Sequence, residues 1–66
     1  MQNIKDFNET LYSHYIGLFH ETNLFETRMY ARRKSNYYGR LLGYSEKELR
    51  DAKAPIINLN ELLKNI

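Results

Sequence analysis

The sequence predicts an all-α fold, a small bundle of three to four short helices with a sharp helix-turn-helix corner. Three observations lead to this fold class: apolar residues recur at helical spacing, two capping boxes mark helix starts, and a glycine and a proline mark helix ends. We expect one domain over residues 1–66, with helices at about 4–20, 24–42, 46–54 and 59–65.

The first helix is predicted from apolar side chains spaced three or four residues apart, with Asn3 or Asp6 as its N-cap. Thr22 or Asn23 is expected to cap the second helix after a short break. Neither proline nor glycine enforces that break, so one long helix over residues 6–42 is the alternative. The apolar stripe of the first helix consists of Ile4, Phe7, Leu11, Tyr15 and Leu18.

The second helix carries small residues in the middle of its predicted buried face, at Ala31 and Ser35. Small side chains four residues apart allow two helix backbones to approach closely. We therefore expect a close crossing between the first two helices.

A corner between the second and third helices is predicted at Gly43, which can adopt the left-handed conformation that ends a helix. Ser45 and Glu48 follow as a capping box, in which the Ser45 hydroxyl accepts from the Glu48 N–H and the Glu48 carboxylate accepts from the Ser45 N–H. Tyr44 and Leu49 flank this box as a hydrophobic staple. The two helices are thus expected to meet with almost no loop.

The third helix is expected to end before Pro55, with Leu49 and Ala52 facing inward and a Glu46–Arg50 ion pair on its outer side. A second capping box recurs further along the chain and predicts the fourth helix. This fourth helix is too short to be stable unaided, so it should dock on the body or order against a partner. The second box is formed by Asn58 and Glu61.

Length and composition limit the possible classes of protein. A 66-residue chain without cysteine has a marginal core, which favours self-association as a homodimer. No apolar run is long enough to span a bilayer and no secretion signal is present, so a cytoplasmic location is expected. Abundant Asn, Ile, Lys and Tyr are typical of AT-rich coding sequences, as in phages and other bacterial mobile elements.

Positive charge is concentrated in the second helix, although the net charge of the chain is only +2. No acidic residue occurs over residues 27–45, and Tyr30, Tyr37 and Tyr38 alternate with the cations. This mixture can bind phosphates and bases or a protein surface; the alternative is a solvated face whose tyrosines cover the edge of the core. The candidate binding residues are Arg28, Arg32, Arg33, Lys34, Tyr37, Arg40, Lys47 and Arg50.

The corner also resembles the helix-turn-helix of bacterial and phage DNA-binding proteins, over about twenty residues. The resemblance implies that residues 46–53 form a recognition helix, with Ser45, Lys47 and Arg50 near base edges or phosphates. Three carboxylates on that helix, and Ala52 where the motif usually has a larger aliphatic residue, depart from the pattern. The residues that carry the resemblance are Gly39, Leu42, Gly43, Tyr44, Ser45, Leu49 and Ala52.

Two functions follow, and neither is enzymatic. His14 and His20 are six residues apart, which does not align them on a helix, and the chain shows no metal-binding or catalytic motif, so no cofactor is expected. The favoured function is binding of a larger protein partner, as an inhibitor or adaptor, through the basic, tyrosine-rich second helix. The alternative is a helix-turn-helix DNA-binding regulator, which makes protein and nucleic acid the two candidate partners.

Overall fold

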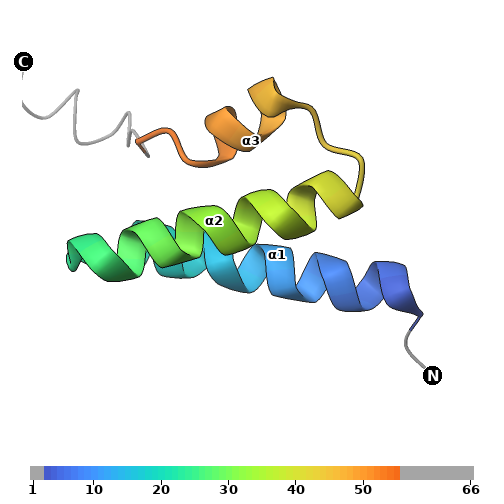
Figure 1. The fold of residues 1–66 in the computed structure, drawn as a ribbon, viewed down its shortest axis with the longest axis horizontal. Coiled ribbons are helices and arrows are strands. Elements are labelled where there is room, and N and C mark those ends of the chain that lie inside the picture. The colour runs from blue at the N-terminus through green and yellow to red at the C-terminus, as the bar shows by residue number, and fades with distance from the viewer. Residues whose placement is uncertain (1–2, 56–66) are drawn as a thin grey trace, which may run out of the picture.

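A computed structural model describes residues 3–55, which form the helices α1 (Ile4–Glu21), α2 (Phe25–Leu41) and α3 (Glu46–Ala52). Helices α1 and α2 lie side by side in opposite directions, and α3 doubles back over α2 (Figure 1). The predicted all-α fold is confirmed. The fourth helix at residues 59–65 and the capping box of Asn58 and Glu61 lie outside the described residues.

The break between α1 and α2 is real, so the alternative of one long helix is wrong. Helix α1 begins after Asn3, whose side chain accepts a hydrogen bond from the Asp6 N–H at 2.8 Å. Helix α2 begins after Leu24, which has extended backbone and no side-chain cap, so the prediction of Thr22 or Asn23 as its N-cap is wrong. The Thr22 hydroxyl instead accepts from the Leu24 N–H at 3.2 Å, which stabilises the turn inside the connection.

Helices α1 and α2 pack over a row of small residues on α2, as the sequence predicts. Ala31 and Ser35 are fully buried, and Gly39 continues the row one turn later. The buried Ser35 hydroxyl donates to the Arg32 carbonyl oxygen at 3.0 Å, so its polar atom is satisfied within its own helix. Because none of these side chains is large, the two backbones can approach closely here.

The stripe on α1 is covered only in part. Leu11, Tyr15 and Leu18 are half-buried, but Ile4 is 80% and Phe7 54% exposed, so the prediction of a continuous buried stripe is wrong at its start. The reason is that α1 extends past the C-terminal end of α2, where the chain turns toward α3 (Figure 1). None of the helices in residues 3–55 is long and apolar enough to cross a membrane.

The corner closes α2 by a Schellman motif. The Tyr44 N–H donates to the Gly39 carbonyl oxygen and the Gly43 N–H to that of Arg40, each at 3.0 Å. Gly43 has a φ of +89°, the left-handed conformation that the sequence predicts for it. Two otherwise unpaired carbonyl groups at the end of α2 are thereby satisfied.

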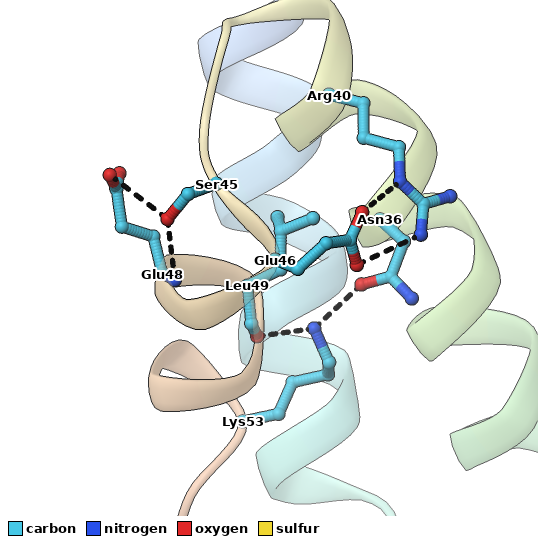
Figure 2. Close-up of polar contacts among 7 residues, drawn as sticks. All are labelled: Asn36, Arg40, Ser45, Glu46, Glu48, Leu49 and Lys53. Atoms are coloured by element: carbon cyan, nitrogen blue, oxygen red, sulfur yellow. Dashed lines mark hydrogen bonds and ion pairs between the residues drawn. The ribbon is translucent and has the colours of Figure 1, made fainter.

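Ser45 is the N-cap of helix α3, and its hydroxyl accepts a hydrogen bond from the Glu48 N–H at 3.1 Å (Figure 2). The second half of the predicted capping box differs. The Ser45 hydroxyl donates to Glu48 Oε1 at 3.3 Å, so the carboxylate accepts from the side chain of Ser45 where we expected its backbone N–H. The helix start is nevertheless the one that the sequence predicts.

The buried side chain that docks helix α3 is Leu49, and polar contacts to α1 and α2 accompany it. Leu49 is 2% exposed and packs on Gly39, where a Cβ atom would overlap Leu49 Cδ2 and lie 3.1 Å from Cε2 of Tyr12 on α1. His20 Nε2 lies 2.7 Å from the Ala52 carbonyl oxygen, and Lys53 binds back to α2. The helix ends at residue 52, two residues earlier than predicted, because the next two N–H groups donate three residues back in a tight turn.

Two glycine-to-alanine substitutions are expected to change the free energy of unfolding in opposite directions. Gly43→Ala should lower it by about 1 kcal/mol, because an alanine must adopt the left-handed conformation. Gly17→Ala should raise it by about 0.5–1 kcal/mol, because a Cβ there meets nothing within 4 Å and alanine favours a helix. Urea unfolding followed by far-UV circular dichroism measures both changes. If Gly43→Ala stabilised the protein as much as Gly17→Ala, the left-handed conformation of Gly43 at the corner would be contradicted.

Candidate functional site

Seven of the eight predicted binding residues line two different surfaces, which α2 forms alone or together with its neighbours. The first surface, which we call the tyrosine–arginine face, follows one side of α2 as two adjoining open grooves of about 490 and 400 Å³. Arg33 and Tyr37 line both grooves and therefore form the ridge between them. The other lining residues are Tyr30, Lys34, Asn36, Arg40 and Leu41.

Tyr37 is the most exposed tyrosine of this face, with 57% of its surface accessible. Its ring meets the ring of Tyr38 edge to face, with centroids 5.1 Å apart, so the contact with Tyr38 supports it. On the next turn, Lys34 Nζ lies 5.7 Å from the centroid of the Tyr30 ring. The face thus presents one supported aromatic ring beside cationic groups.

Not every tyrosine of α2 belongs to this face. The Tyr38 ring stacks on Tyr15 of α1 with centroids 6.0 Å apart, and Tyr30 meets the same ring edge to face at 5.8 Å. The neighbouring Tyr30 hydroxyl also raises the pKa of Tyr15 above its ordinary value. The alternative interpretation, in which tyrosines cover the edge of the core, therefore holds for Tyr38 and in part for Tyr30.

Arg40 is paired with an acidic residue of α3. Its Nε and Nη2 atoms donate to the two carboxylate oxygens of Glu46 at 2.9 and 3.2 Å (Figure 2). The predicted Glu46–Arg50 pair is therefore wrong, because the corner brings Glu46 against the end of α2. These hydrogen bonds and the charge of Arg40 lower the pKa of Glu46, and the carboxylate in turn raises the pKa of Arg40. The charge of Arg40 on the face is thus largely offset.

Replacing Arg40 by glutamine is expected to raise the pKa of Glu46 toward its ordinary value of 4.5. Because the folded-state pKa is lowered, the pair stabilises the protein above the unfolded-state pKa, and this contribution disappears as the pH falls through the folded-state pKa. An NMR titration of the Glu46 carboxyl carbon measures the shift, with Lys47→Gln as the control. An unchanged Glu46 pKa in Arg40→Gln would mean that the pair does not persist in solution.

The second surface, the α2–α3 groove, lies where all three helices meet and has a volume of about 360 Å³. Phe19 comes from α1, and Arg28 places its guanidinium 4.8 Å from the centroid of the Phe19 ring. Among residues 3–55, no acidic side chain lines this groove. Its lining residues are Phe19, Phe25, Arg28, Met29, Arg32, Arg50 and Lys53.

Lys53 joins α3 to α2 at the edge of this groove. Its Nζ donates to Asn36 Oδ1 at 2.7 Å and to the Leu49 carbonyl oxygen (Figure 2). Burial lowers the pKa of Lys53, and the positive charges of Arg32 and Arg40 lower it further. The groove therefore holds positive charge that its described lining residues do not neutralise.

The structure thus divides the eight predicted residues. The tyrosine–arginine face is lined by Arg33, Lys34, Tyr37 and Arg40. The α2–α3 groove is lined by Arg28, Arg32 and Arg50. Lys47 is exposed on α3 and lines neither surface.

Sequence reasoning missed the apolar part of the groove and its lysine. Phe25 and Met29 are four residues apart, interleaved with Arg28 and Arg32, so a helical projection of α2 could have identified them as one side of a site. Phe19 and Lys53 carry no such signal, because their positions depend on how α1 and α3 dock.

Within residues 3–55, no three His, Cys, Asp or Glu side chains are grouped so that they could hold a metal ion. Compared with known protein families, curated proteins and solved structures, the chain shows no match.

Proposed function

We propose that this protein binds a larger protein partner, as an inhibitor or adaptor, through the tyrosine–arginine face of α2. The observation that carries the proposal is the exposed Tyr37 ring, which stands with Arg33 between two grooves and rests on Tyr38. Tyrosine and arginine are the residue types that most often dominate the binding energy of protein interfaces. A supported ring also loses little conformational freedom when a partner covers it.

The charge around the face favours a protein over a nucleic acid. Glu46 neutralises Arg40, and α3 carries Glu48 and Asp51 as further exposed carboxylates. A phosphate backbone that followed α2 into the corner would meet these negative charges. A protein surface can instead provide its own mixture of charges, and such binding needs no nucleophile, general base or cofactor.

Pull-down from a lysate of the source organism tests the proposal. The wild-type chain should retain one protein in stoichiometric amount, and both Tyr37→Ala and Arg33→Ala should lose it. Lys47→Ala is the matched control, because Lys47 is exposed but lines neither surface. Recovery of nucleic acid alone, or equal recovery with Tyr37→Ala, would refute protein binding through this face.

A DNA-binding regulator is the second candidate, and the geometry of the corner supports it. Gly39 lies against Leu49, and Gly43 has positive φ, as the resemblance to a helix-turn-helix requires. On this alternative, duplex binding should weaken steeply with added salt, and Arg33→Ala combined with Arg40→Ala should reduce it. Absence of binding to any duplex at low salt would exclude this candidate.

A homodimer is compatible with either function. Ile4 and Phe7 leave apolar surface exposed at the start of α1, which a second copy could cover. Light scattering should then give twice the monomer mass, and Phe7→Ser should return the mass to that of the monomer. A monomeric wild-type protein would rule the dimer out.

A further inference from the structure

We propose that the α2–α3 groove is a second docking site, which binds an acidic segment of the protein partner carrying one apolar side chain flanked by carboxylates. This inference rests on the proposed function, because the segment belongs to the same partner. The groove lies apart from the tyrosine–arginine face and shares no lining residue with it.

The apolar part of the groove gives the segment its anchor. Phe25 is 74% exposed, and Met29, one turn later, continues the apolar surface toward Phe19. The volume of about 360 Å³ lies within the range of ligand-binding pockets in proteins. Covering these side chains removes apolar surface from water, and the thioether of Met29 adapts to different side chains.

The charges around the anchor select an acidic ligand. Arg28 and Arg32 are one helical turn apart on α2, Arg50 faces them from α3, and Lys53 closes the edge. In the part of the chain that the structure describes, these four cations line the groove without a carboxylate. Burial lowers the pKa of Lys53, and the positive charge of Arg32 lowers it further, so a carboxylate placed between these two cations would relieve their repulsion as well as form ion pairs.

Two other occupants fit less well. The eleven residues after Pro55 contain Glu61 and Lys64, so their net charge of zero does not complement the groove. A nucleic acid would extend its phosphates beyond the groove toward the exposed carboxylates of α3, which repel them. A peptide can place its negative charges at the groove alone.

A peptide titration of the full-length protein tests the inference. The probe is a short synthetic peptide that alternates glutamate with leucine, and its control has glutamine in place of glutamate. Amide shifts in the ¹H–¹⁵N spectrum report which surface binds. We expect the acidic peptide to shift the signals of Phe25, Met29 and Arg50, and the control peptide to bind about tenfold more weakly.

Two pairs of neighbouring substitutions make the test specific. Arg32→Gln should weaken peptide binding several-fold, whereas Arg33→Gln, which changes the adjacent arginine on the other surface, should not. Phe25→Ala should weaken it about tenfold, whereas Leu24→Ala should not, although Leu24 is also exposed. Both apolar residues are mostly solvated, so their loss leaves the fold intact.

The groove proposal and the proposed function fail in different ways. Equal binding of both peptides, or shifts confined to Arg33 and Tyr37, would overturn the groove proposal. The groove proposal would also be overturned if Phe25→Ala and Arg32→Gln still retained the partner in the pull-down. Loss of the partner with Tyr37→Ala in the same experiment would still support the proposed function. If a DNA oligonucleotide shifted the signals of Phe25, Met29 and Arg50 and neither peptide did, the groove would be a phosphate-binding site. That result would contradict the inference.

Discussion

Leu49→Ala is expected to lower the free energy of unfolding by about 2–5 kcal/mol, the range measured for large-to-small substitutions in protein cores. Leu49 is the largest fully buried side chain in the part of the chain that the structure describes. A chain of this length has a total stability of roughly 3–10 kcal/mol, so α3 should lose its docking site. Urea unfolding by circular dichroism measures the change, with Lys47→Ala on the exposed side of α3 as control.

A double-mutant cycle with Gly39 identifies the contact itself. Gly39→Ala alone should be destabilising, because its Cβ would overlap Leu49 and crowd Tyr12. In the Leu49→Ala background the same change should cost less, since the overlap with Leu49 is gone and only the contact with Tyr12 remains. An equal cost in both backgrounds would show that α3 does not pack on Gly39.

Ser35→Leu is the second substitution with a large expected effect. Ser35 is fully buried between α1 and α2, and a leucine there must push the two helices apart or adopt a strained rotamer. We expect the free energy of unfolding to fall by about 1–3 kcal/mol. The urea midpoint should be lower, while the slope of the free energy against urea concentration stays nearly unchanged.

Two controls separate crowding from other causes. Ser35→Ala should change stability by less than about 1 kcal/mol, because the hydroxyl bonds only to its own helix and alanine is the better helix former. Ser13→Leu adds the same side chain at an exposed position of α1 and should be tolerated. A stable Ser35→Leu protein would refute the close helix crossing.

The local signals in the sequence predict most of the fold. Gly43 and Ser45 mark the corner because the Schellman motif and the N-cap depend only on nearby backbone groups. The same holds for Asn3 at the start of α1. The start of α2 could not be predicted in this way, because Leu24 makes no side-chain cap and the turn before it relies on Thr22.

Contacts between helices were harder to predict. Arg50 and Arg40 compete for Glu46, and only the path of the corner shows that Arg40 is the partner. The separation of the basic residues into two surfaces was hard to predict for the same reason, because it depends on how the helices pack. Arg32 and Arg33 are neighbours in the sequence, yet the helix directs them to different surfaces, and the docking of α3 turns one of these surfaces into a groove.

We expect Tyr37 and Arg33 to contact the protein partner, and site-specific photo-crosslinking in the source cells detects such a contact. A benzophenone amino acid replaces Tyr37, and a second chain carries it at Lys47 as the matched control. We predict one protein adduct from position 37, none from position 47, and loss of the adduct when Arg33→Ala is added. An adduct with nucleic acid alone, or equal protein adducts from both positions, would contradict the claim.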